Sequence, residues 1–273
     1  EGPRYADLRH LAGLELPDAL EICGQPLPLD DPEIREALEY ELLLTLGRPM
    51  MPLLWLRRAP EHLPRIERSL AEAGLPDDLK YVAVVESDLR GWTESPAGAL
   101  GLWQIMRATG KRYGLRIDRY IDERLDPVRS GEAAMAYLRD LDEQFGDWFL
   151  ALAAYNAGHN ALERTLAEDD SRSYFEIYLP RETRRYVLRI AAAKLVMTAE
   201  DHYGLPVLPS PPRLARREVT VEVEQVRKPL QEVAGEHGVT YGVLRRLNPK
   251  LVSRWLPRGE HSLLLPDEEG EGR

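Results

Sequence analysis

Apolar residues recur at helical spacing through most of the chain, and this period constrains the fold more than any other feature of the sequence. Between residues 30 and 204, apolar side chains return every three or four positions, in segments that open on Asp or Pro and close on Gly. We predict helices at residues 30–47, 60–73, 76–86, 127–145, 148–157 and 181–203. This region is therefore expected to hold five to seven helices and no strand.

The period changes after residue 204. Residues 205–217 read LPVLPSPPRLARR, a proline-rich linker that should be semi-extended and marks a domain boundary. Beyond it, Val219, Val221 and Val223 alternate with polar residues, as in a half-buried strand. Two short helices at 230–237 and 240–247 and a last strand at 261–265 are expected to follow. The order strand, helix, helix, strand predicts a small α+β module over residues 218–266.

The two ends of the chain carry weaker signals. Residues 1–29 contain Gly, Pro and short apolar clusters without a clear period, which predicts an irregular arm. With the first two helices this arm forms an extension, residues 1–74, that we expect to pack on the main helical domain at 75–204. The acidic tail at 267–273 is expected to be disordered.

Composition excludes several classes of function. With 36 basic and 46 acidic residues the net charge is −10, so we expect no nucleic-acid partner. No apolar run approaches the roughly 20 residues that a spanning helix needs. Cys23 is the only cysteine, which excludes an intrachain disulfide and predicts a buried small apolar residue. The six histidines lack ligand spacing, and we expect neither a metal nor a cofactor.

Glu86 stands at the junction between an apolar run and a turn-rich loop. The run Tyr81–Val85 is rich in β-branched residues and by itself fits a buried strand or a helix, but Pro76 and the two Asp residues after it form a good helix start. A carboxyl group at the edge of so apolar a segment should have a raised pKa. The alternative is that Glu86 is an ordinary solvated acid at a helix end.

A second carboxylate near Glu86 is not evident. Cleavage of a glycosidic bond usually needs one carboxylic acid and a second carboxylate that acts as nucleophile or base. Asp88 lies two positions on and points to another side of the helix. Glu94 lies on the following loop, where an acid is usually solvated.

Four ordered blocks of sequence resemble a known family. They are Glu86-Ser87, then Ser95-x-x-Gly98-Ala99-x-Gly101-Leu102-x-Gln104-Ile105-Met106, then Ala154-Tyr155-Asn156-Ala157-Gly158, then Glu182-Thr183-x-x-Tyr186-Val187. Together they resemble the family 1 lytic transglycosylases over roughly residues 75–204. Trp103 stands where most relatives have Met, and in this the chain resembles the membrane-bound murein transglycosylase D type of the family, which favours Trp.

The resemblance implies a mainly α, goose-lysozyme-like catalytic domain that cuts the bond between N-acetylmuramic acid and N-acetylglucosamine without water. In such enzymes the C6 hydroxyl of the muramic acid attacks the anomeric carbon, so one Glu can serve as acid and then as base. The absence of a second carboxylate is then expected. Glu86 would be the sole catalytic residue.

Further site residues follow from the resemblance, each with a structural alternative. Expected substrate contacts are Ser95, Gln104, Met106, Tyr155, Asn156 and Tyr186, with Ser87, Gly98, Gly101 and Glu182 in support. The loop residues among them could instead only form turns, Met106 could pack in the core, and Asn156 could only cap a helix. Trp92 and Trp103 fit sugar stacking or core packing equally well, and Arg107 stands where relatives often have Pro or a small residue.

Two other functions stay open at this stage. One is a lysozyme-type hydrolase of the same fold, with Glu94 or another loop acid activating water. The other is a peptidoglycan-binding scaffold without turnover. In every case the expected partner is the glycan strand of peptidoglycan, and the expected place is the periplasm or cell envelope. We expect a monomer, with outer-membrane anchoring through a removed N-terminal lipid anchor as an option. The C-terminal module resembles a LysM repeat but lacks its usual opening motif, so glycan binding and simple packing are both open.

Overall fold

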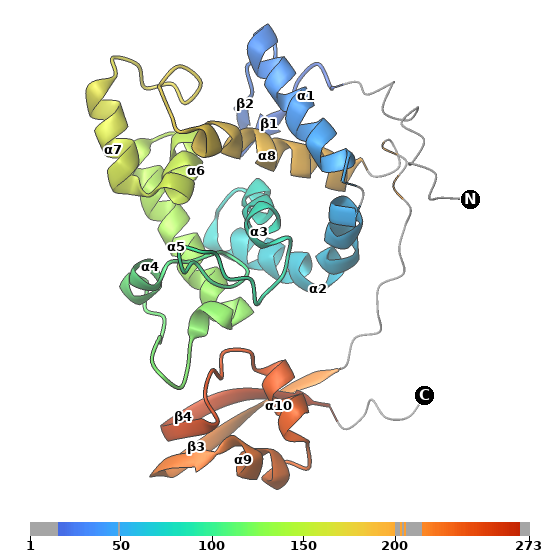
Figure 1. Cartoon of the computed structure of the whole chain (residues 1–273), viewed down its shortest axis with the longest axis vertical. Coiled ribbons are helices and arrows are strands. Elements are labelled where there is room, and N and C mark those ends of the chain that lie inside the picture. The colour runs from blue at the N-terminus through green and yellow to red at the C-terminus, as the bar shows by residue number, and fades with distance from the viewer. Residues whose placement is uncertain (1–15, 49, 200–202, 204, 206–214, 268–273) are drawn as a thin grey trace. The chain divides into compact units, whose positions relative to one another are not determined.

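The computed structural model describes residues 16–48, 50–199, 203, 205 and 215–267 (Figure 1). These residues are mainly helical, as predicted, and form two antiparallel two-stranded sheets. The chain divides into two compact units. The helical unit comprises Glu1–Leu89 and Ala134–Ser210, and the mixed unit comprises Arg90–Ala133 and Pro211–Arg273.

Helix α8 is the centre of the helical unit. The unit contains α1 (Pro32–Leu46), α2 (Met50–Ala73), α3 (Lys80–Ser87), α6 (Trp148–Ala157), α7 (His159–Glu168), α8 (Arg181–Thr198) and the later part of α5 (Pro127–Phe145). α8 contacts α1, α2, α3 and α6, and Figure 1 shows it running beside α1. Three consecutive alanines of α8, residues 191–193, are fully buried. Their small side chains let the surrounding helices approach closely, so α8 is packed on several sides.

An ion pair joins α1 to α8. Helix α1 begins at the predicted place, where the Asp31 carboxylate accepts a hydrogen bond from the Glu33 amide at 2.8 Å. One turn before its end, the buried Glu41 accepts hydrogen bonds from both Nε and Nη2 of Arg185, the latter at 3.0 Å. A bidentate pair of this kind fixes the angle of one helix against the other.

Truncating Glu41 should measure how much this ion pair stabilises the helical unit. We expect Glu41→Ala to lower the free energy of unfolding by about 2 kcal/mol, because Arg185 loses a charged acceptor in a half-buried place. Urea unfolding followed by circular dichroism measures the change. Glu36→Ala, an exposed acid of the same helix, should change stability by less than about 0.5 kcal/mol. Equal losses in both variants would contradict the role of the ion pair.

The structure corrects several predicted boundaries. α1 to α8 all lie within residues 30–204, so the predicted number of five to seven helices was too low. The short α4 (Arg107–Arg112) and α7 were missed because each has few apolar residues: α4 reads RATGKR, and Leu162 is the buried residue of α7. α2 starts at Met50, ten residues before the prediction, because its buried face continues from Trp55 to Leu70 across Pro60 and Pro64. Packing of that face outweighs the cost of proline inside a helix. α8 ends at Thr198.

The predicted irregular arm contains a hairpin. Strands β1 (Glu21–Ile22) and β2 (Gln25–Pro26) pair antiparallel, and the turn between them places Cys23 and Gly24 at φ 55° and 77°. Cys23 is buried as predicted, and burial raises the pKa of its thiol. Each strand has only two residues, which is too few for an alternating apolar pattern to be visible in the sequence. Residues 1–15 lie outside the described part of the chain.

The C-terminal part of the mixed unit has the predicted order of strand, helix, helix, strand. β3 (Arg216–Pro229) pairs antiparallel with β4 (Trp255–Pro266), and α9 (Leu230–Glu236) and α10 (Tyr241–Leu247) lie between them in sequence. Both strands are longer than predicted. In β3 the residues from Glu224 to Arg227 are exposed and lack apolar alternation, and the first half of β4 reads WLPRGE, which contains Pro and Gly. Most of the linker at 205–217 and nearly all of the tail at 267–273 fall outside the described residues.

Residues 117–126 pack against this C-terminal module, although the sequence assigns them to the main helical domain. Ile121 belongs to the same buried cluster as Val221, Leu244 and Leu263. The Asp122 amide donates to the Lys250 carbonyl at 2.9 Å. The predicted functional division of the chain into domains stays a prediction. In the ranges that the structure describes, no helix has the length and apolar character needed to cross a membrane.

Candidate active site

Glu86 lies in the last turn of α3, which confirms a helix rather than a strand for the apolar run. All five residues from Tyr81 to Val85 are buried. The helix ends abruptly because Asp88 and Leu89 both take left-handed backbone angles, φ 53° and 56°. Such angles are strained in residues other than glycine and persist only where the surroundings hold them.

Two side chains of α2 hold this strained helix end. Trp55 donates its indole Nε1–H to the Asp88 carboxylate at 2.9 Å, and Arg58 donates to the Asp88 carbonyl at 2.8 Å. The Asp88 carboxylate therefore binds α2 and does not pair with Glu86 as a second catalytic carboxylate, as its spacing predicts. The contacts fix the point at which the chain leaves α3, and with it the position of Glu86.

The carboxyl group of Glu86 meets α8. The hydroxyl of the fully buried Tyr186 donates a hydrogen bond to Glu86 Oε1 at 2.6 Å. Arg189, one turn further along α8, donates from Nη2 to the carbonyl of Val85 at 2.9 Å. Burial raises the pKa of Glu86 above its ordinary value, the Tyr186 hydrogen bond and the Arg189 charge lower it, and the Glu182 charge raises it again. The net shift is upward, so Glu86 keeps its proton to a higher pH than a solvated acid.

The raised pKa predicts a pH-dependent stability difference between the native chain and Glu86→Gln. Below the pKa of an unfolded Glu, the carboxyl is protonated in both states and the difference should be small. As the pH rises, Glu86 ionises first in the unfolded state. The free energy of unfolding of the native chain should therefore fall, relative to that of the variant, by about 1.4 kcal/mol for each unit by which folding raises the pKa of Glu86. Thermal unfolding between pH 3 and pH 8 measures this. A variant that is equally or less stable at pH 8 would contradict the burial of Glu86.

Two other predicted residues of the helical unit lie near Glu86. The ring of Tyr155 packs against Tyr137 with centroids 5.4 Å apart. Burial raises the pKa of the Tyr155 hydroxyl, and the negative charge of Glu86 raises it further. Glu182 is exposed, and its charge acts on Glu86 as described above. Glu86, Tyr155, Glu182 and Tyr186, which are up to a hundred residues apart in sequence, are thus neighbours in the fold.

Asn156 and Ser87 have structural contacts. The side-chain oxygen of Asn156 accepts a hydrogen bond from the Thr183 hydroxyl at 3.0 Å, which ties the end of α6 to the start of α8. The Ser87 hydroxyl donates to the Ala83 carbonyl at 3.0 Å, within its own helix. Asn156 therefore does more than cap its helix.

The predicted site residues of the mixed unit lie on one tightly bonded loop. The Ser95 hydroxyl accepts from the Ala99 amide at 3.0 Å, and Gln104 Nε2 donates to the carbonyls of Thr93 at 2.8 Å and Gly101 at 2.9 Å. Gly98 and Gly101 have φ 84° and 85°. These contacts support the turn-forming alternative, and they leave a contact with sugar untested.

Gly101 is required by packing as well as by its backbone angle. A Cβ atom at this position would lie 2.0 Å from the carbonyl oxygen of Arg124. Arg124 is buried against Asp122 at 2.7 Å and donates from Nη1 to the carbonyls of Gly98 at 2.9 Å and Ile105 at 3.2 Å. Arg124 thus holds the loop in shape. This role was not predicted, because a lone Arg among charged residues usually lies on a solvated surface.

The remaining loop residues divide clearly by exposure. Trp103 is fully buried and belongs to the core, whereas Trp92 is 72% exposed. Met106 is 44% exposed, so the core-packing alternative for it was wrong. Glu94 is exposed on the same loop. Arg107 donates to the carbonyl of Ile117 at 3.0 Å, and this hydrogen bond fixes the segment that follows the loop.

Comparison with known proteins gives a family for the region around Glu86. Residues 65–178 match a family model described as Transglycosylase SLT domain. This region is a transglycosylase SLT domain. The resemblance seen in the sequence is confirmed. The matched SLT residues include Glu86 and the loop to Met106, but end before α8, so Glu182 and Tyr186 lie beyond them.

Curated relatives of the SLT domain agree with this family. The membrane-bound lytic murein transglycosylase D of Escherichia coli K12 is 32% identical over 198 residues, which are 70% of this chain and 43% of that protein. The peptidoglycan transglycosylase gp16 of Escherichia phage T7 is 36% identical over 134 residues, 47% of this chain and 10% of the relative. The chain therefore spans less than half the length of these relatives.

Among solved structures, the 70-kDa soluble lytic transglycosylase of Escherichia coli is similar with a TM-score of 0.44 and 24% identity. The similarity covers 62% of this chain and 29% of that one.

Proposed function

We propose that the chain is a peptidoglycan lytic transglycosylase, in which Glu86 alone acts as acid and then as base. The bond that it cuts joins N-acetylmuramic acid to N-acetylglucosamine and leaves a 1,6-anhydro ring on the muramic acid. The observation that carries the proposal is the setting of Glu86 in an SLT domain: a carboxyl group with a raised pKa, at a strained helix end, bonded to the Tyr186 hydroxyl.

The proposed reaction balances with one carboxyl group. Protonated Glu86 gives its proton to the glycosidic oxygen as the bond from that oxygen to the anomeric carbon breaks, and N-acetylglucosamine departs as an alcohol. The N-acetyl group of the muramic acid stabilises the positive charge that develops at the anomeric carbon. Ionised Glu86 then takes the proton of the C6 hydroxyl as O6 bonds to the anomeric carbon. Glu86 ends protonated, and no water is consumed.

The surroundings of Glu86 suit both halves of this cycle. Burial and the Glu182 charge favour the protonated form that the first step needs. The Tyr186 hydrogen bond and the Arg189 charge stabilise the carboxylate that exists between the steps. We further propose that the fold around Glu86 is goose-lysozyme-like and that Ser95, Gln104, Met106, Tyr155 and Asn156 contact the glycan. Tyr186, expected as a contact, is fully buried and would act through Glu86 instead.

A digestion assay tests whether the protein turns over at all. Purified sacculi are incubated with the native chain and with Glu86→Gln, and soluble muropeptides are quantified by chromatography. We expect release only with the native chain. Equal and negligible release by both, together with binding of both to sacculi, would favour a peptidoglycan-binding scaffold instead.

A hydrolase of the same fold is the second candidate, and one observation favours it. Glu182 is a second carboxylate close enough for its charge to raise the pKa of Glu86, so it could activate water. Against this, Glu182 sits on an exposed turn of α8, whereas the transglycosylase reaction needs no second carboxylate. The two candidates differ in their products.

We also propose a place in the cell envelope, where peptidoglycan lies. The name of the D-type relative, a membrane-bound murein enzyme, supports this placement. The C-terminal module, with its strand, helix, helix, strand order, is proposed to be LysM-like, and either binds glycan strands or serves as a packing element. The proposed partner is the glycan strand.

A further inference from the structure

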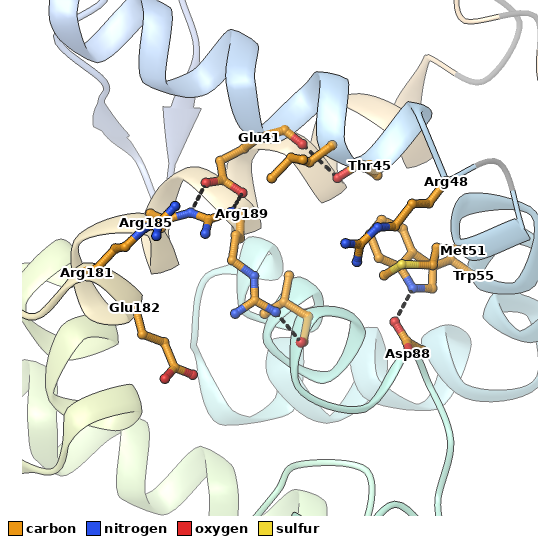
Figure 2. Close-up of a pocket in the computed structure, with 12 residues that line it drawn as sticks. Glu41, Thr45, Arg48, Met51, Trp55, Asp88, Arg181, Glu182, Arg185 and Arg189 are labelled. Carbon is orange, nitrogen blue, oxygen red and sulfur yellow. Dashed lines mark hydrogen bonds and ion pairs between the residues drawn. The ribbon is translucent and has the colours of Figure 1, made fainter.

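A pocket rich in arginine lies beside the end of α3, within the helical unit (Figure 2). Its volume is about 580 Å³, and its walls come from α1, α2, α3 and α8. Four arginines line it: Arg48, Arg181, Arg185 and Arg189. Three acids also line it, Glu41, Asp88 and Glu182, so the arginines outnumber the carboxylates by one.

Not all of these cations are used by the fold. Arg185 is bound by Glu41, and Asp88, another acid of the lining, accepts the Trp55 indole hydrogen bond. Arg48 and Arg181 are exposed, and neither side chain makes a hydrogen bond or ion pair with the residues that the structure describes. Arg48 thus offers unused donors to the opening, and Figure 2 shows its guanidinium pointing inward from the end of α1.

The pocket adjoins the proposed catalytic group. Val85, the residue before Glu86, is part of its wall. Arg189 lines the pocket while it donates to the Val85 carbonyl, and its charge acts on Glu86. Glu182 likewise belongs both to the lining and to the electrostatic surroundings of Glu86. Glu86 itself is not among the residues that line the pocket, so a ligand group here would lie near the catalytic group rather than in contact with it.

We propose that this pocket binds a carboxylate of the peptidoglycan substrate, with Arg48 and Arg189 as the principal donors. Guanidinium groups match carboxylates in shape and charge, and bind them through paired hydrogen bonds. The substrate offers this group in two places. One is the lactyl carboxylate of a muramic acid whose stem peptide has been removed, and the other is the set of carboxylates on an intact stem peptide. This inference rests on the proposed function.

Binding without turnover tests the site directly. The dissociation constant is measured for Glu86→Gln, and for the same protein carrying Arg48→Gln, by isothermal titration calorimetry. Four probes are used: a muropeptide with free stem carboxylates, the same muropeptide with those carboxylates amidated, a peptide-free glycan with free lactyl carboxylates, and a neutral N-acetylglucosamine oligomer. Arg184→Gln, which removes an exposed charge of α8 outside the pocket, is the matched control.

We expect Arg48→Gln to weaken binding of a carboxylate-bearing probe about fivefold, as for one partly solvent-exposed charge pair, and to leave the neutral oligomer unchanged. Arg48→Lys should restore part of the loss, and Arg184→Gln should have no such effect. The probe that loses affinity identifies the carboxylate that the pocket binds. A loss for the muropeptide with free stem carboxylates indicates the stem peptide, and a loss for the peptide-free glycan indicates the lactyl carboxylate.

Unchanged affinities for all four probes, or an equal loss for charged and neutral probes, would overturn the site. Because no turnover is measured, this result is separate from failure of the proposed function. That failure would appear as absence of cleavage by the native chain.

Discussion

Glu86→Gln is expected to lower the rate of glycan cleavage about a thousandfold, the usual contribution of a general acid. Glutamine keeps the size of the side chain and can still meet the Tyr186 hydroxyl, but it has no proton to give to the glycosidic oxygen. The loss should appear in kcat, because the shape of the groove is kept. Release of soluble muropeptides from purified sacculi, followed over time, measures it.

The matching experiment replaces Glu94, the loop acid considered for a hydrolase. Under the proposed mechanism Glu94→Gln should retain most of the native rate, since Glu94 is exposed and has no step to perform. A loss in Glu94→Gln as large as that in Glu86→Gln would contradict the single-acid mechanism. Both variants should unfold cooperatively, which circular dichroism checks.

Tyr186→Phe is expected to slow cleavage about tenfold to a hundredfold. Its hydroxyl is bonded to Glu86 at 2.6 Å and stabilises the carboxylate that forms as the proton leaves. A hydrogen bond to a charged group is worth about 1.5–3 kcal/mol, which corresponds to a rate change of this size. Without it the pKa of Glu86 rises further, so the pH at which activity falls on the alkaline side should move upward.

Glu182→Gln should shift the pKa of Glu86 in the opposite direction, downward. Removing this charge takes away one of the two causes that raise the pKa of Glu86, so the alkaline limb should move to lower pH. The pH dependence of kcat/KM for both variants reports the free enzyme. Shifts of both variants in the same direction, or no shift in either, would contradict the electrostatic account of Glu86. Loss of nearly all activity in Glu182→Gln would favour the hydrolase.

Sequence periodicity was enough to find the long helices and the order of the C-terminal module. It succeeded where a helix has one apolar face and clear ends, as in α1 with Asp31 and Gly47. It failed where packing overrides local preference. Pro60 reads as a helix start, yet Pro60 and Pro64 both lie inside α2 because the face from Trp55 to Leu70 is buried as one surface.

The proposed site was only partly visible in the sequence. The setting of Glu86 at the end of an apolar helix predicts its raised pKa, and the resemblance pointed to Tyr186, which the structure places against it. The arginines were not predicted. Arg124, Arg185 and Arg189 owe their roles to carbonyls and carboxylates from distant parts of the chain. No local pattern of residues reports such contacts, because they exist only once the helices are packed.

The mass of the cleavage products tests the central claim most directly. Sacculi are digested by the native chain in water labelled with heavy oxygen, and the muropeptides are analysed by mass spectrometry. Attack by the C6 hydroxyl predicts products with 1,6-anhydromuramic ends, each lighter by one water than a reducing end and free of the label. Products with reducing ends that carry the label would show that water is the nucleophile, and would contradict the single-acid transglycosylase mechanism.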